Sequence, residues 1–190
     1  MGIDNDKFSM MTEPSSTAES YDALQRCLTR ISPWAAAVID GREEASGAVL
    51  LRSHVLATLR LLKGGHKGIL LEFLYEAGLI GGFGSAHGAR LSLSSADLRH
   101  AELHQLGLGR AQLIATILNE ADCRGCYLAG ANLGGADLIK TNLAGADLTE
   151  ANLALADLRG ANLAGAVLIG AKVTPRQLEQ AADVAGVVGV

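Results

Sequence analysis

Two cysteines lie three positions apart, at Cys123 and Cys126, which is the spacing of half a zinc site and of redox-active cysteine pairs. Two histidines, His100 and His104, lie four positions apart, which is the spacing of metal ligands on one face of a helix. A zinc site needs about four ligands that face one point. These residues can therefore bind metal only if the surrounding structure turns their side chains together.

The other motifs that suggest chemistry are weak. The segment GGFGSAHG at 81–88 has the glycine content of a phosphate-binding loop but lacks the Lys-Ser/Thr ending of such loops. No combination of Ser, His and Asp residues, and no pair of carboxylates, can be placed in a shared pocket from the sequence. We therefore expect no cofactor and predict that the protein is not an enzyme.

A repeat of five residues decides where these side chains point. Leucine recurs at every fifth position from Leu93 to Leu168, with Cys123 replacing it once and Val173 ending the series. A second series, two residues earlier in each repeat, consists mostly of alanine. Neither a helix, with its period of about 3.6, nor a strand, with its period of about 2, keeps such a series on one side. The chain must therefore turn regularly, in step with the repeat.

The segment 131–165 consists of ANLGG, ADLIK, TNLAG, ADLTE, ANLAL, ADLRG and ANLAG without a gap. This pattern resembles the pentapeptide-repeat family, whose consensus is A(D/N)LXX. The segment LRLLKGGHKGILLEFLYEAGLI at 59–80 is similar to one found ahead of the repeats in bacterial members. The resemblance covers 91–173 and implies a right-handed quadrilateral β-helix, in which the leucine and the residue two before it point inward.

Residue sizes agree with this arrangement. A narrow coil has room for leucine only if the second inward position stays small, as alanine does. Asp or Asn before the leucine can hydrogen-bond the backbone of a turn, and glycine at a corner adopts dihedral angles that other residues avoid. Cys123 and Cys126 then fall on the two inward series, so we expect buried thiols and no metal. His100 and His104 fall on the surface, at different positions of adjacent repeats.

The chain divides into five segments. We expect a disordered tail at 1–15, a small α-helical domain at 16–80, a glycine-rich linker at 81–90, a β-helix of about four coils at 91–173, and a short C-terminal capping helix with a tail at 174–190.

Helix start and stop signals refine these segments. Ser16 and Glu19 form a possible capping box, and Pro33 predicts the start of a second helix. Further helices are expected over 48–62 and 67–77, with Gly78 as the C-cap. The C-terminal helix is predicted from the capping signal T-P-R-Q that begins at Thr174.

Composition limits the setting and the partners. The 190 residues carry a formal net charge of −4, which gives no reason to expect direct binding of nucleic acid. No segment approaches the ~20 apolar residues that a membrane span needs. Three cysteines, an odd number, favour reduced thiols and a cytoplasmic location.

Four repeats per coil would stack every fourth repeat on one side. One such side collects charges of both signs, and we predict it as an interaction face. Apolar residues that point outward, such as Ile114 and Leu155, exceed what a solvated wall needs. Either the helices cover them, or a protein partner or second copy does. The predicted face consists of Asp97, Arg99, His100, Asn119, Glu120, Asp137, Ile139, Lys140, Asp157 and Arg159.

These observations favour a non-catalytic protein–protein interaction or scaffold module, whose partner is another protein; a homodimer is the second option. The resemblance implies an alternative, because some family members bind DNA gyrase by imitating DNA and give resistance to topoisomerase poisons. Imitation needs a dense negative stripe. The repeats hold eight acidic residues against six basic ones, which is a weak excess.

Overall fold

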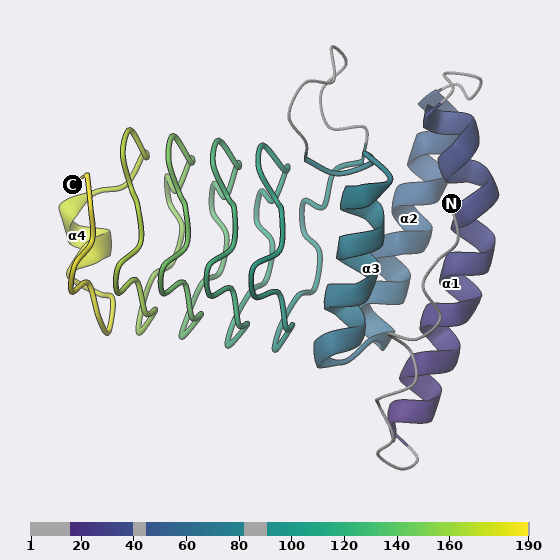
Figure 1. The fold of residues 1–190 in the computed structure, drawn as a ribbon, viewed down its shortest axis with the longest axis horizontal. Helices are drawn as coiled ribbons and strands as arrows, with labels where there is room; N and C mark the ends of the chain where they lie inside the picture. The colour runs from purple at the N-terminus through teal and green to yellow at the C-terminus, as the bar shows by residue number, and fades with distance from the viewer. Residues whose placement is uncertain (1–15, 40–44, 82–90, 190) are drawn as a thin grey trace.

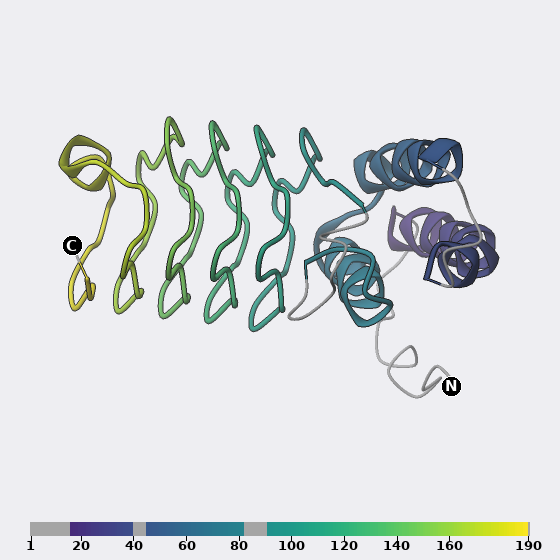
Figure 2. The same cartoon turned by 90° about the horizontal axis from the view of Figure 1, so that it is seen from above.

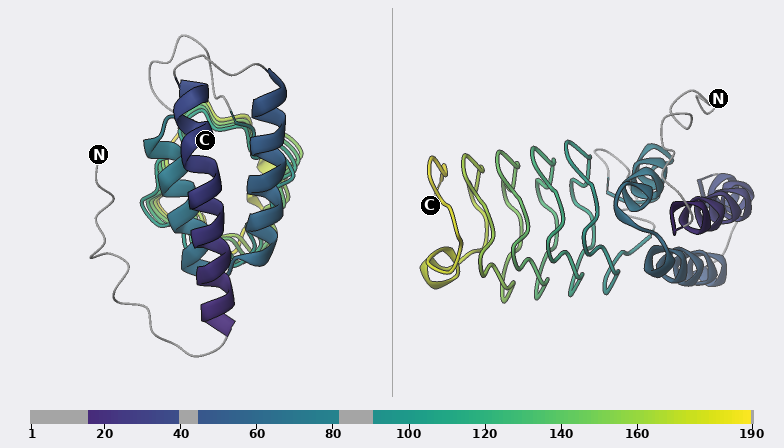
Figure 3. Two further views of the ribbon diagram at one scale, coloured as in Figure 1. Left: turned by 90° about the vertical axis from the view of Figure 1, so that its right-hand side faces the viewer. Right: turned by 90° about the horizontal axis from the view of Figure 1, so that it is seen from below.

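The computed structural model describes residues 16–39, 45–81 and 91–189. Helices α1 (Ser16–Ile39), α2 (Ala45–Leu61) and α3 (Gly64–Glu76) stand at one end of a column of coils, and the short α4 (Pro175–Leu178) lies at the other end (Figure 1). Helix α1 packs on α2 and α3, which lie between α1 and the first coil (Figures 2 and 3). None of the described helices is long and apolar enough to cross a membrane.

The helical end differs from the prediction at Pro33. Helix α1 continues to Ile39 with Pro33 inside it, so the second helix expected to start there does not exist. A proline within a helix removes the backbone hydrogen bond to the carbonyl four residues earlier. Pro33 and Thr29, whose carbonyl is the one freed, are both exposed. The predicted tail, most of the linker and the side chain of Ser16 lie outside the described residues.

Helix α3 begins at Gly64, three residues earlier than predicted, and ends as the glycine signal indicates. Gly78 has a φ of 65° and donates its N–H to the Tyr75 carbonyl at 2.8 Å. Leu79 donates to the Leu74 carbonyl at 2.9 Å, which completes the glycine-terminated helix end described by Schellman. Leu79 also accepts a hydrogen bond from the N–H of Leu91, so the chain on both sides of 82–90 is already tied together.

The repeats form the expected coils of twenty residues. Parallel bridges join residues twenty positions apart, such as Asp97 to Ile117 and Asn132 to Asn152. Each repeat ends in a two-residue turn, so within the described residues the bridges are isolated and no extended strand develops. The predicted β-helix is therefore confirmed, and each side of a coil is joined to the next coil through a single bridged residue.

The interior of the column consists of the two inward series. Its leucines and alanines are almost all fully buried from 91 to 168. Where Thr116, Thr141 or Cys126 replaces an inward alanine, its side chain donates a hydrogen bond to a carbonyl of the preceding coil at 3.2, 2.7 and 2.7 Å respectively. A hydroxyl or thiol group is tolerated inside the column because it donates a hydrogen bond to a backbone carbonyl there.

The corners are shaped by the residues around each leucine. The Asp137 carboxylate accepts a hydrogen bond from the N–H of Ile139 at 3.2 Å, and equivalent Asp and Asn residues do the same elsewhere. The last residue of each repeat has a positive φ, as in Gly145 at 66°. In the part of the chain that the structure describes, nine residues other than glycine adopt this conformation, among them Leu155 at 63°.

Residues after α4 do not form the expected tail. Lys172 pairs with Asn152 before α4, and Asp183 pairs with Asn162 and Val188 with Val167 after it, so α4 interrupts a fifth coil that the chain then continues. The separation in these pairs is 21 residues instead of 20, because α4 is inserted in place of a regular side. Gln177, within α4, donates to two carbonyls of the coil below and forms the predicted capping box with Thr174.

Candidate interaction face

The structure brings all ten residues of the predicted face onto one side of the column. The repeats that contain them are stacked coil on coil. The N–H of His100 donates to the Asn119 carbonyl at 3.0 Å, and the N–H of Lys140 donates to the Arg159 carbonyl at 2.9 Å. We call this side, formed by the repeats centred on Leu98, Leu118, Leu138 and Leu158, the charged face. Its role as a binding surface stays a prediction.

Two aspartates of the charged face are paired within their own repeats. An oxygen of Asp97 lies 2.7 Å from a guanidinium nitrogen of Arg99, and Asp157 pairs with Arg159 at the same distance. The arginine holds the pKa of each aspartate below its usual range, mainly through these hydrogen bonds. The spacing Asp-x-Arg therefore places a matched ion pair at both ends of the face.

A column of charged corners runs along the edge of the face. Glu120 lies between His100 and Lys140, with oxygen-to-nitrogen distances of 3.4 and 3.7 Å. All three side chains are at least half exposed and start from residues with positive φ. Exposed pairs of this kind stabilise a protein by less than about 1 kcal/mol each, so these groups remain available to a partner.

The centre of the face is different. Asp137 forms no ion pair among the described residues, and its carboxylate accepts only the hydrogen bond of its own turn. Ile117 and Ile139 lie beside it and are half-buried. The side-chain oxygen of Asn119 is buried and has no hydrogen-bond partner among the described residues. The centre of the face thus combines an unpaired carboxylate and an unpaired amide oxygen with two apolar side chains.

A further charged residue reaches the face from the helical end. Lys67 of α3 is buried and donates a hydrogen bond to the Arg99 carbonyl at 3.0 Å, while its nitrogen lies 3.5 Å from Asp97. Burial lowers the pKa of Lys67 more than the nearby Asp97 raises it. Sequence reasoning missed this lysine, because α3 and the repeat are far apart in the chain. Its only signal in the sequence is that it is the single lysine of a mostly apolar helix.

The two cysteines point into the column as predicted. Cys123 and Cys126 are both buried, and the pKa of the Cys123 thiol is raised by its hydrogen bond with Cys126 and by burial. His100 lies beside Glu120, and His104 is exposed on the neighbouring side. Across the described residues, no three His, Cys, Asp or Glu side chains gather where they could hold a metal ion.

The helices do not cover the outward apolar residues. Helices α1 to α3 and α4 stand at the ends of the column and leave its walls open (Figures 1 and 2). Ile114, Leu155 and Ile169 are exposed, with Leu155 at 91%. Of the two alternatives, burial of these side chains by the helices is therefore wrong, because capping the ends places the helices away from the walls.

Stacked coils of four five-residue repeats, with a leucine inside each side, define a β-helix of the pentapeptide type. The family model of pentapeptide repeats matches residues 108–143 and 141–174, with eight copies. This segment, about a third of the chain, belongs to the pentapeptide-repeat family. A comparison with curated proteins found no match.

Solved structures of pentapeptide-repeat proteins are similar to this chain. Rfr23 from the cyanobacterium Cyanothece 51142 is 34% identical over 57% of this chain and 66% of its own, with a TM-score of 0.31. QnrB1, a plasmid-mediated fluoroquinolone resistance protein, is 21% identical over 51% and 49%, with a TM-score of 0.38. HetL from Nostoc sp. strain PCC 7120, involved in heterocyst differentiation regulation, is 27% identical over 52% and 51%, with a TM-score of 0.23. The chain spans about half to two thirds of the length of these proteins.

Proposed function

We propose that the protein is a non-catalytic interaction module that binds another protein through the charged face, without a cofactor. The observation that carries this proposal is the unmatched centre of the face. Among the described residues Asp137 forms no ion pair there and interacts with Arg159 of the next coil only at longer range, and the half-buried Ile117 and Ile139 flank it. The matched pairs at Asp97 and Asp157 surround this centre with charges that need no partner. Such a centre favours a partner that offers one basic group and an apolar contact.

Imitation of DNA is less well supported. A DNA mimic needs uncompensated negative charge at about the density of DNA phosphates. Asp97, Asp122 and Asp157 each hold an arginine within 2.7 Å, and Glu120 lies between two basic groups. Four of the eight carboxylates in the repeats therefore lie against basic side chains, which interrupts any uncompensated negative stripe. A gyrase supercoiling assay with the purified protein tests the alternative, since inhibition or protection from a poison at stoichiometric levels would favour it.

The test of the main proposal is a pull-down from the native host with the tagged full chain. The double variant Asp137→Ala with Lys140→Ala removes the central carboxylate and its neighbouring charge without changing the net charge. We expect it to lose a partner that the parent chain retains. The matched control is Asp147→Ala with Glu150→Ala, which changes the same two repeat positions on another side of the column. If both double variants retain every captured partner, the charged face is not the binding surface.

A further inference from the structure

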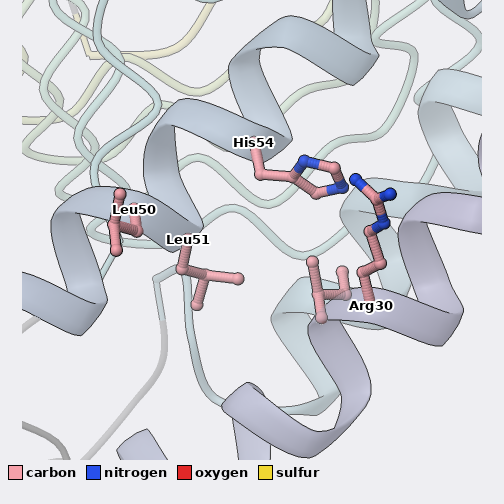
Figure 4. A pocket seen from close by; sticks show the side chains of 5 residues that line it. Arg30, Leu50, Leu51 and His54 are labelled. Carbon is pink, nitrogen blue, oxygen red and sulfur yellow. The ribbon is translucent and has the colours of Figure 1, made fainter.

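The helical end contains a hollow that the repeats do not explain. It lies between α1 and α2 and has a volume of about 310 Å³. None of its described lining residues belongs to the charged face. Pockets that bind small molecules begin at about this size. Among the described side chains, Arg30, Ile31, Leu50, Leu51 and His54 line the hollow (Figure 4).

One part of the hollow is apolar. Ile31 and Leu51 belong to the buried core between the helices, and they offer fixed apolar walls. Leu50 is 59% exposed, so it lies where the hollow opens to solvent. An exposed leucine beside a hollow is costly to leave in water, and an apolar ligand body would cover it.

The other part of the hollow is basic and unsatisfied. Figure 4 shows the His54 ring and the Arg30 guanidinium pointing toward each other. The Nε2 atom of His54 is buried and has no hydrogen-bond partner among the described residues. A guanidinium has donors only, and an imidazole nitrogen that carries a proton is also a donor. An oxygen placed between the two side chains would accept from both.

We propose that this hollow binds a small organic carboxylic acid. Its carboxylate accepts hydrogen bonds from the Arg30 guanidinium and from His54 Nε2, and its apolar body packs on Ile31, Leu50 and Leu51. A carboxylate matches the planar fork of an arginine, and the apolar body attached to it distinguishes it from inorganic phosphate, which the fork also accepts. Each part of the ligand thus has a counterpart in the hollow. The anion lies at the basic end, and the apolar body lies on the leucines and Ile31, with Leu50 at the opening.

Calorimetric titration of the full chain with three probes tests the chemistry of the ligand. Hexanoate carries both the charge and the apolar body, hexanol carries only the body, and inorganic phosphate carries only the charge. We expect hexanoate to bind at least tenfold more tightly than either of the others. No binding of hexanoate at millimolar concentration, or equal binding of hexanol or phosphate, would overturn the proposal.

Variants test the location. Arg30→Gln and His54→Gln are each expected to weaken hexanoate binding at least tenfold. Leu50→Trp fills the opening from an exposed position and is expected to weaken it similarly without disturbing the core. The control is Arg60→Gln, which removes another exposed arginine in the last turn of α2, outside the hollow. Binding that survives Arg30→Gln and Leu50→Trp, or that falls equally with Arg60→Gln, contradicts this site.

Discussion

Lys67 of α3 donates a hydrogen bond to the backbone oxygen of Arg99 in the first coil, with a nitrogen-to-oxygen distance of 3.0 Å. In the interior of the column such oxygens accept from the preceding coil, which the first coil lacks. Arg52 of α2 does the same for the carbonyls of Ser92 and Ser94, at 2.9 and 2.7 Å. The helical end thus satisfies an open edge that would otherwise invite another chain.

Replacement of this lysine should cost stability. Lys67→Met keeps most of the apolar stem but leaves the Arg99 carbonyl without its donor, so we expect a loss of about 1–3 kcal/mol in the free energy of unfolding. Urea denaturation measures it. Lys140→Met is the control, because Lys140 is exposed and its pair with Glu120 contributes less than about 1 kcal/mol. Equal losses in the two variants would contradict an edge-capping role for Lys67.

Gly68 should tolerate no side chain. Glycine inside a helix is usually about 1 kcal/mol less favourable than alanine, so Gly→Ala normally stabilises. Here a Cβ on Gly68 would clash with the backbone oxygen of Glu102 in the first coil. We expect Gly68→Ala to destabilise by about 1–3 kcal/mol, since α3 would have to move away from the coil. Thermal unfolding shows whether Gly68→Ala lowers stability instead of raising it. Ser53→Ala, on the exposed side of α2, is the neutral control.

Substitutions to and from glycine at the last position of a repeat should change stability in opposite directions. Leu155 has a φ of 63° and is 91% exposed, so its side chain gains little from packing. Because the left-handed conformation costs a residue other than glycine about 1–2 kcal/mol, Leu155→Gly should leave stability unchanged or raise it by about 1 kcal/mol. Gly145→Ala, at the same repeat position with φ 66° and open space around a Cβ, should lower it by about 1 kcal/mol. Urea denaturation measures the free energy of unfolding of both variants. If Leu155→Gly lowers it more than Gly145→Ala does, the backbone at Leu155 is not strained.

Acid should weaken the protein through its Asp-x-Arg pairs. Arg99 and, to a smaller extent, Lys67 lower the pKa of Asp97 in the folded state. Its contribution to stability is therefore complete above the unfolded pKa of about 3.9 and is lost as the pH falls toward the lower folded pKa. Unfolding free energies measured from about pH 5 to about pH 2 should fall less steeply in Asp97→Asn than in the parent chain. Parallel curves would show that this carboxylate is not linked to folding.

The sequence by itself determined the column. A strict five-residue period fixes which side chains point inward and which repeats share a side, so the inward thiols of Cys123 and Cys126 and the membership of the charged face followed from counting. Each coil contacts only its neighbours, so no distant part of the chain can change this register.

Only the tertiary structure decided how the column ends and what its surface offers. Lys67, Arg52 and Gly68 meet the first coil because of the way the helices pack, and no repeat relates them to it. The continuation of the fifth coil after α4 depends on Gln177, which donates hydrogen bonds to two carbonyls of the preceding coil. The pocket between Arg30 and His54 likewise depends on how α1 crosses α2. Contacts between segments without a common period depend on packing geometry, which residue spacing does not encode.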